Sequence, residues 1–493
     1  MAPHFFNTLS GRVEEFQPLH DHEVRMYACG PTVYDYGHIG NFRTFVFVDL
    51  LRRYLKQHYT LRHVMNITDV DDKIIRNSAA AGVSINEYTK KYQQAFLEDA
   101  EALNIERPEI VRATEHIDEM AKFIQQLVDK GFAYRTEDGS YYFRIAKFPE
   151  YGKLSKKDFA GIENGARVDV DEYEKDNARD FALWKAPKPG EHFWETSIGP
   201  GRPGWHIECS VMSMGALGET LDIHTGGEDL VFPHHENEIA QSEAATGKPF
   251  VRYWIHARFL LVEGEKMSKS LGNFYTLRDL VLMGHKPSSI RYLLSSVPYR
   301  KQLNFTFDGL TTAANAVERL RNFKRRLELE KREAGSSPAM KQLAEETISK
   351  MDAALADDMN TAQALAAVFD MVRDANNAAD RGELKQGDVE PFQKALAAFD
   401  AVFAVLTDDD AQKVKKIVEW AESEGKADKV TPQARAIAAA AGTSDAEIDA
   451  LVHEMQEARK AKNFLRGDEI RNQLNQMGII VEVTKDGARW RRK

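Results

Sequence analysis

Residues 24–41 read VRMYACGPTVYDYGHIGN, an apolar run that passes into a loop rich in glycine and polar residues. The run from Val24 to Cys29 predicts a buried strand, and residues 30–40 predict a tight loop. Residues 42–55 then have helical periodicity, and residues 61–67 predict a second strand. Strand, helix and strand in this order predict a βαβ unit within a parallel sheet.

The end of this loop predicts a phosphate site. His38 and Gly40 lie where the helix is expected to begin, and a helix start offers free backbone N–H groups and the positive end of the helix dipole. A histidine followed by glycine lets a second donor approach the same phosphates. We therefore expect a nucleotide at this turn.

The alternation of strand and helix returns further along the chain. Residues 131–203 combine short aromatic runs, turn residues and charges, which predicts an insertion of mixed structure. Residues 221–224 predict a strand, 225–227 its turn, 234–245 a helix and 254–262 another strand. The predicted fold class is α/β, with a doubly wound parallel nucleotide-binding (Rossmann-like) domain split by an insertion.

The remainder of the chain differs from this pattern. Beyond residue 310, apolar residues recur with helical periodicity and predict an α-helical bundle. Asp408 to Asp410, and then residues 422–432, have linker composition. An amphipathic helix and a strand over 478–483 predict a small C-terminal α/β domain.

Composition narrows the class of protein. The chain has 493 residues and 43% apolar content, enough for several cores. No apolar run approaches the roughly 18 residues needed to span a bilayer, and the first residues lack a basic segment followed by an apolar one. We expect a cytoplasmic protein with no membrane partner. The net charge of −10 also disfavours a generally basic surface, and no DNA partner is expected.

The charge is unevenly distributed. Residues 459–493 hold ten Lys or Arg against four Asp or Glu, a net charge of +6. Trp490 could stack on an unpaired base while Arg489, Arg491 and Arg492 hold phosphates, a combination suited to single-stranded RNA loops. The alternative interpretation is a solvated basic end.

Residues 265–270, EKMSKS, predict a loop with two mobile positive charges. Lys266 and Lys269 are suited to gripping a polyphosphate. Taken alone, such a short match is a polar surface loop. Its pairing with the upstream turn at His38 indicates nucleotide chemistry.

Two cysteines and two residues of one predicted helix form a candidate metal site. His234 and Glu238 are four apart and share one face of the helix. With Cys29 and Cys209 they form a set that suits tetrahedral zinc. The alternatives are a surface His–Glu pair and two small buried thiols. The absence of any Cys-x-x-Cys pattern argues against a redox pair or a disulfide framework.

Five segments, in order, resemble the class I aminoacyl-tRNA synthetases, and specifically the cysteinyl-tRNA synthetase family. They are residues 27–41 (YACGPTVYDYGHIGN), 66–69 (NITD), 204–210 (GWHIECS), 232–238 (FPHHENE) and the lysine loop. The resemblance extends over nearly the whole chain, to the closing residues 490–493.

The resemblance implies ATP-dependent activation of L-cysteine to cysteinyl-adenylate, followed by transfer to the 3′ end of tRNA(Cys). It implies that His38, Asn41, Lys266 and Lys269 serve catalysis by electrostatics and positioning, without a protein nucleophile. It also implies one Zn²⁺, which binds the substrate thiol and rejects serine, and Mg²⁺ that accompanies ATP.

Further site residues follow from the same resemblance. The ATP-binding set is Gly40, Ser268, Lys269 and Ser270. The substrate-binding set is Gly30, Thr32, Thr68, Trp205 and Asp229, although Thr68 and Asp229 are also suited to capping turns. His206 and His224 are expected to lie in the core or behind the metal ligands.

One position departs from the family pattern. Asn41 stands where the family motif His-Ile-Gly-His ends in histidine, and an amide still donates but cannot become cationic. Its alternative role is that of a helix N-cap. Two rival functions stay open: a ligase that joins activated cysteine to a small amine, and a silent zinc- and RNA-binding paralogue.

The expected domain division follows the motifs. It comprises the first half of the catalytic domain (1–130), the insertion (131–203), the second half of the catalytic domain (204–262), the segment with the lysine loop (263–310), a helix bundle for the anticodon stem (311–408), a linker (409–443) and a basic anticodon-recognition domain (444–493).

Overall fold

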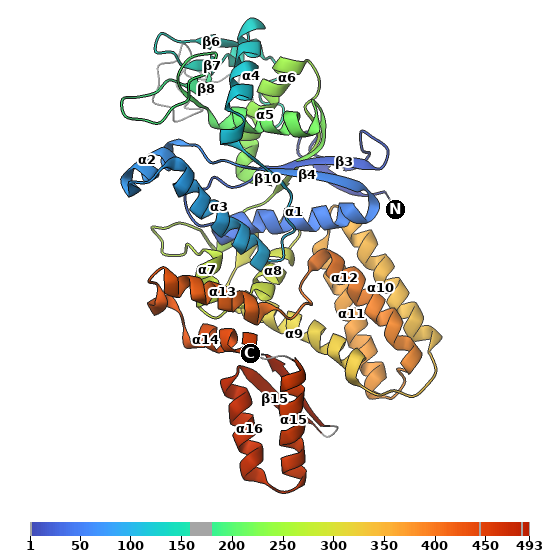
Figure 1. Ribbon diagram of the computed structural model, residues 1–493. Coiled ribbons are helices and arrows are strands. Elements are labelled where there is room, and N and C mark those ends of the chain that lie inside the picture. The colour runs from blue at the N-terminus through green and yellow to red at the C-terminus, as the bar shows by residue number, and fades with distance from the viewer. Residues whose placement is uncertain (1, 158–179, 443–444, 485–486, 493) are drawn as a thin grey trace.

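A computed structural model describes residues 2–157, 180–442, 445–484 and 487–492 (Figure 1). Its centre is a five-stranded parallel sheet in the order β11-β10-β3-β4-β5. The strands are β3 (Glu23–Ala28), β4 (Thr60–Ile67), β5 (Glu109–Arg112), β10 (Leu221–Gly227) and β11 (Val251–Ala257). After β3 the chain adds β4 and then β5 on one side of β3. Later it adds β10 and then β11 on the other side. The switch point, where such sheets bind ligands, therefore lies between β3 and β10.

Helices cover both faces of this sheet, which confirms the predicted doubly wound α/β fold. Figure 1 shows α4, α5 and α6 on one side of the sheet and α1 and α3 on the other. The helices are α1 (Ile39–His58), α2 (Asp72–Ala81), α3 (Ile85–Ala102), α4 (Ile117–Asp129), α5 (Trp205–Leu217) and α6 (Glu236–Thr246).

Two predicted boundaries are wrong. Residues 225–227, expected as a turn, continue β10, because they pair with β11 as far as Gly227 opposite Ala257. Residues 254–262, expected as one strand, belong to two sheets. β11 ends at Ala257, where the Arg258 amide turns to donate to the Tyr299 carbonyl at 2.8 Å.

The strand that follows, β12 (Leu260–Val262), belongs to a small sheet that carries the lysine loop. It pairs with β13 (Glu265–Lys266) and β14 (Leu303–Phe305). Helices α7 (Leu277–Leu282) and α8 (Pro287–Ser295) come between β13 and β14 in the chain. At the other end of the chain, β1 (His4–Asn7) and β2 (Arg12–Glu15) form a hairpin.

The described part of the insertion forms an antiparallel sheet in the order β6-β7-β8-β9. Its strands are β6 (Ala133–Arg135), β7 (Tyr141–Phe143), β8 (Phe181–Lys185) and β9 (Arg202–Pro203). Buried aromatic side chains such as Phe143, Phe181 and Trp184 join this sheet to α4, α5 and α6 in one core.

The predicted helix bundle is present and begins slightly earlier than expected. Its helices are α9 (Phe307–Leu329), α10 (Pro338–Ala356), α11 (Thr361–Asp380) and α12 (Val389–Phe403). Thr306 caps α9 by accepting from the Gly309 amide, so the helix includes residues before 311.

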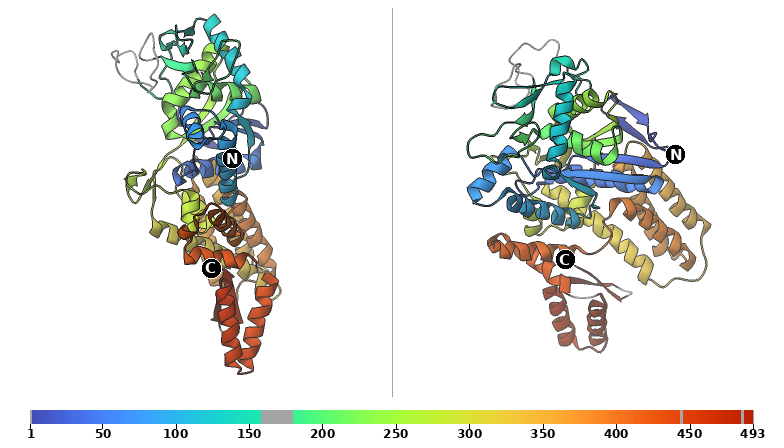
Figure 2. Two further views of the ribbon diagram at one scale, coloured as in Figure 1. Left: turned by 60° about the vertical axis from the view of Figure 1, so that its left-hand side comes forward. Right: turned by 45° about the horizontal axis from the view of Figure 1, so that its top comes forward.

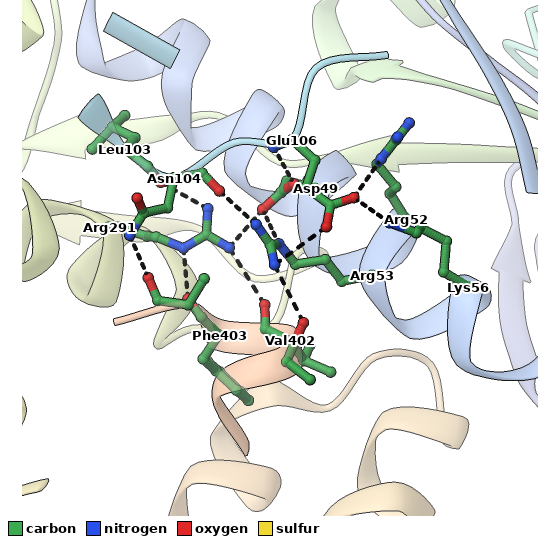
Figure 3. A network of polar contacts seen from close by, with 12 residues as sticks. Asp49, Arg52, Arg53, Lys56, Leu103, Asn104, Glu106, Arg291, Val402 and Phe403 are labelled. Carbon is green, nitrogen blue, oxygen red and sulfur yellow. Dashed lines mark hydrogen bonds and ion pairs between the residues drawn. The ribbon is translucent and has the colours of Figure 1, made fainter. Parts of the chain in front are cut away.

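A buried arginine, Arg291, joins the bundle to the catalytic domain (Figure 3). Arg291 of α8 donates to Asp49 of α1 at 2.6 Å, and both side chains are fully buried. The same guanidinium donates to the carbonyls of Leu103 and Phe403, at 2.8 and 2.6 Å. Elements from three parts of the chain therefore meet at one arginine.

The segment 409–443 is not the linker that its composition suggested. It contains α13 (Asp410–Ser423) and α14 (Pro432–Ala439), which bury Val414, Ile417 and Ile437 against neighbouring helices. A small C-terminal domain follows, with α15 (Asp445–Lys460), α16 (Phe464–Gln476) and the hairpin β15 (Ile479–Thr484) and β16 (Gly487–Arg492). Figure 2 shows it projecting beyond α13 and α14.

Among the described helices, none combines the length and apolarity that crossing a lipid bilayer requires.

Candidate active site

The two cysteines come together at the switch point of the sheet. Cys29 directly follows β3, and Cys209 lies in α5, with 3.9 Å between the two sulfurs. The Cys29 sulfur is 3.8 Å from Glu238 Oε1, and His234 Nε2 is 3.1 Å from the same oxygen. All four residues are buried, and their donor atoms lie within 4.8 Å of one another.

A second set of four donors overlaps the first. His224 and His235 replace Cys209 and His234 beside Cys29 and Glu238. His235 Nε2 is 3.3 Å from the Cys29 sulfur, and His224 Nε2 is 2.9 Å from Glu238 Oε2. The sequence did not single out His235, because it is adjacent to His234 and only the irregular turn before α6 brings both rings inward.

Further histidines hold these donors in place. His206 Nδ1 is 2.9 Å from His234 Nδ1. His235 Nδ1 is 2.7 Å from His256 Nε2, and the other nitrogen of His256 is 2.7 Å from the Thr8 hydroxyl. Such outer partners orient imidazole ligands and fix which nitrogen carries the proton.

The cluster carries charge although it is buried. Burial opposes the ionisation of Glu238, but attraction to His224 and His234 outweighs it and lowers its pKa to about 2. The hydrogen bond from Cys29 lowers the pKa of Cys209 to about 6, whereas burial raises the pKa of Cys29 well above its usual value. A buried carboxylate beside two thiols suits a dication, which binds thiolates and imidazoles in tetrahedral sites.

The loop after β3 is closely packed at Gly30. Its amide donates to Asn66 Oδ1 at 2.8 Å, and a Cβ at Gly30 would lie 1.7 Å from the Asn66 carbonyl oxygen. Asn66 also donates to the Thr68 hydroxyl at 3.1 Å, and Thr68 donates to Glu208 at 2.9 Å. Thr68 pairs with Thr32 through the backbone. Asn66 is thus a positioning residue to which the sequence assigned no role.

Two other residues expected to bind substrate lie on α5 and shortly after β10. Trp205 at the start of α5 is 43% exposed, and its ring centre lies 4.2 Å from that of His234. Asp229 follows β10, and its carboxylate lies over Gly227, where a Cβ would be 2.3 Å from Oδ1. A partly exposed indole next to a buried donor set is consistent with a wall of a substrate pocket.

The turn at the start of α1 has a capping arrangement that the sequence did not predict. His38, not Asn41, is the N-cap, and its Nδ1 accepts from the Asn41 amide at 3.1 Å. The Asn41 side chain accepts in return from the His38 amide at 3.1 Å. Burial and the charge of Lys269 lower the pKa of His38 to about 4. Because Nδ1 accepts, the neutral ring carries its proton on Nε2, which can then donate.

The lysine loop lies against this turn. A Cβ at Gly40 would be 3.1 Å from Met267 Cε and 2.9 Å from His38 Nδ1, so glycine permits the approach. Lys269 donates to Asp35 at 3.0 Å and lies 5.1 Å from the centre of the Phe274 ring.

The other residues of the loop have different surroundings. Lys266 is exposed on β13. The Ser268 amide donates to Asn273 Oδ1 at 2.8 Å, and the Ser268 and Ser270 hydroxyls are 3.1 Å apart. These contacts order the loop internally.

The predicted RNA-binding residues lie on β16. The indole N–H of Trp490 donates to Asp449 at 2.6 Å, and Arg325 of α9 lies 5.6 Å from the centre of its ring. Trp490 therefore links the C-terminal domain to the bundle. The side chains of Arg489, Arg491 and Arg492 lie outside the described part of the structure.

Comparisons with known proteins match this architecture. A family model for the tRNA synthetases class I (C) catalytic domain matches residues 15–315, a DALR domain matches 350–407, and a cysteinyl-tRNA ligase anticodon binding domain matches 441–491. The fold is similar to that of methionyl-tRNA synthetase from Mycobacterium tuberculosis bound by methionyl-adenylate. That similarity has a TM-score of 0.56 and 15% identity, over 86% of this chain and 95% of the other. The chain is thus a class I aminoacyl-tRNA synthetase.

Two sequence relatives define the family within that class. The chain is 69% identical to the cysteine–tRNA ligase of Koribacter versatilis (strain Ellin345) and 57% identical to that of Solibacter usitatus (strain Ellin6076), in both cases over 100% of each chain. The chain belongs to the cysteine–tRNA ligase family.

Proposed function

We propose that the protein activates L-cysteine with ATP and transfers it to the 3′ end of tRNA(Cys), with a zinc ion selecting the substrate thiol. The observation that carries this proposal is the buried set of donors from Cys29, Cys209, His234 and Glu238 at the switch point of the sheet. When bound, zinc would supply a soft Lewis acid that prefers a thiolate to a hydroxyl. A pocket of apolar shape alone separates isosteres such as cysteine and serine poorly.

Of the two overlapping donor sets, the one with Cys209 and His234 fits zinc better. It offers two sulfur ligands, and its imidazole lies beside Trp205, the partly exposed residue of the site. His224 and His235 are suited to holding the metal ligands in place. His224 is within hydrogen-bond distance of Glu238, and His235 is within hydrogen-bond distance of Cys29.

We infer that His38 and the two lysines serve the adenylation step. In-line attack by the substrate carboxylate on the α-phosphorus of ATP builds negative charge on the phosphates. The Nε2 proton of neutral His38 is a donor for the α-phosphate, and Lys266 and Lys269 oppose the charge of the departing pyrophosphate. Gly40 is suited to close approach of ATP, Ser268 and Ser270 hold the loop, and Mg²⁺ accompanies the nucleotide.

The remaining assignments are proposals of the same kind. Gly30, Thr32, Thr68, Trp205 and Asp229 form the cysteine pocket, with Asp229 as the partner of the substrate ammonium. Asn41 keeps His38 in place through the reciprocal cap. Arg489, Trp490, Arg491 and Arg492 bind the anticodon region. We also propose that the chain is divided into two catalytic halves, an insertion, a helix bundle and a C-terminal domain. We propose a cytoplasmic location.

Metal analysis combined with two variants tests the site. Purified protein should contain one zinc per chain, and cobalt substitution should give a sulfur–metal absorption band that changes when cysteine is added. Cys209→Ser should lose metal, whereas His235→Ala, the matched control from the other donor set, should retain most of it. Retention by Cys209→Ser together with loss by His235→Ala would assign the metal to the other set.

Activity separates the rival functions. Cysteine-dependent exchange of pyrophosphate into ATP, followed by transfer to tRNA(Cys), supports the proposal. Exchange without transfer to tRNA favours a ligase acting on a small amine, and loss of both favours a silent paralogue.

A further inference from the structure

A hollow of about 320 Å³ lies beside the lysine loop, apart from the buried sulfur cluster. Four segments of the chain line it: the loop before α1, the lysine loop, α7, and the end of α13 with the turn after it. Its main lining residues are Asp35, Tyr36, Lys269, Trp420, Lys426 and Lys429.

The aromatic rings of this hollow already have partners. Arg278 and Lys426 lie 4.3 and 4.6 Å from the centre of the Trp420 ring. The same two cations lie 5.2 and 5.1 Å from the centre of the Tyr36 ring. Rings engaged in this way hold cations in place and offer little free face for stacking a base.

The charges of the hollow are unevenly balanced. Asp35 pairs with Lys269, and Asp279 accepts from both the amide and the hydroxyl of Thr276 as a helix cap. Among the described residues, neither Lys426 nor Lys429 forms an ion pair. The lining thus holds three lysines against two aspartates, a net charge of +1, and two of those lysines form no ion pair with a described residue, an arrangement suited to an anion.

The position of the hollow indicates which anion. Figure 1 and Figure 2 place α13 and α14 between the catalytic sheet with its helices and the C-terminal domain. An RNA that contacts that domain and also reaches the His38 turn passes this face of the molecule. Phosphodiesters are the anions that such an RNA presents along its whole length.

We propose that this hollow is a subsite for a backbone phosphate of the tRNA near its reactive end, bound by Lys426 and Lys429. Trp420 and Tyr36 fix the Lys426 ammonium at the rim. The proposal rests on the proposed function, because it requires tRNA as the substrate. Free pyrophosphate has the same chemistry and is the competing occupant.

A charge-removing double variant tests the subsite. Lys426→Gln combined with Lys429→Gln should weaken tRNA binding and flatten the dependence of log Kd on log salt by about one unit per lysine. The matched control is Lys415→Gln, an exposed lysine of the preceding helix α13 that lies 3.8 Å from Glu419, which should leave the slope unchanged. Lys426→Arg with Lys429→Arg, which keeps both charges, should restore binding and guards against a folding defect.

Pyrophosphate exchange measured without tRNA distinguishes the two occupants. In the double glutamine variant, pyrophosphate exchange should keep the wild-type rate. Single-turnover transfer of cysteine to subsaturating tRNA should become slower. An equal loss in exchange would assign the hollow to pyrophosphate and overturn the proposal, as would an unchanged salt slope. A wild-type protein that fails to charge tRNA(Cys) at all would instead contradict the proposed function.

Discussion

Two aspartate–cation pairs, one in the loop before α1 and one within α1, differ in their burial. Asp49 and Arg291 are 2.6 Å apart with both side chains fully buried, whereas Asp35 and Lys269 are 3.0 Å apart with side chains 42% and 68% exposed. A buried pair is costly to break because it leaves an uncompensated charge, while an exposed pair contributes little. The first pair is thus a fixed joint, and the second is a contact that a polyphosphate can displace.

The largest effect is expected at the joint. Asp49→Ala should destabilise the protein by about 3–5 kcal/mol, because Arg291 keeps its buried charge without a counter-ion. Urea unfolding measures the loss. Glu390→Ala, which breaks an exposed pair of α12 with Lys394, is the control and should cost no more than about 0.5 kcal/mol. Equal costs would show that burial does not distinguish the two kinds of pair.

The exposed lysine should matter for chemistry and not for stability. Lys269→Ala should slow adenylate formation about 10²-fold or more, since the charge that it opposes develops as pyrophosphate leaves. Cysteine affinity and the unfolding midpoint should stay close to wild type. Pre-steady-state measurement of the chemical step checks this, with Lys269→Arg as the variant that keeps the charge. An unchanged chemical step would leave the lysine only a role in recruiting ATP.

The same lysine should also be detectable through His38. Burial, and then the charge of Lys269, hold the His38 pKa at about 4, below the ordinary value of 6.5. Lys269→Ala should therefore raise this pKa in an NMR titration, though not to 6.5, because burial remains. As pH falls from about 6.5 to about 4, the unfolded chain takes up a proton that folded His38 does not, so this group lowers stability over that window. An unchanged His38 pKa would show that the charge of Lys269 does not act on His38.

The smallest effect is expected for Asp35. Asp35→Asn removes the charge that holds Lys269, so the KM for ATP should fall by up to roughly fivefold, the scale of an exposed pair of at most about 1 kcal/mol. Stability should barely change. A rise in KM would instead show that Asp35 presents Lys269 to the nucleotide.

The candidate metal site of Cys29, Cys209, His234 and Glu238 could be predicted in part, because residue spacing and strand order are visible in the sequence. His234 and Glu238 are four residues apart, as on one face of a helix, although α6 begins only at Glu236 and His234 lies in the turn before it. Cys29 directly follows a strand at the switch point of a parallel sheet. His235 could not be recognised, since spacing does not reveal that the turn before α6 brings neighbouring rings to one centre.

The helices of 409–443 were missed for a different reason. Their sequence is polar enough to resemble a linker, and their few apolar residues are buried only because other helices lie beside them. The capping role of His38 was likewise hidden, because asparagine is the commoner N-cap and histidine was already assigned to the phosphates.

The thiol content of the chain offers an analytical use. The sequence has only Cys29 and Cys209, and both are buried at one place in the fold. A thiol reagent too bulky for the substrate pocket can therefore react with the metal-free native protein only when this region opens, so its rate of modification measures the free energy of that local opening. Any cysteine introduced on the surface would react first, which makes the protein suitable for labelling at a single chosen site without removing a native residue.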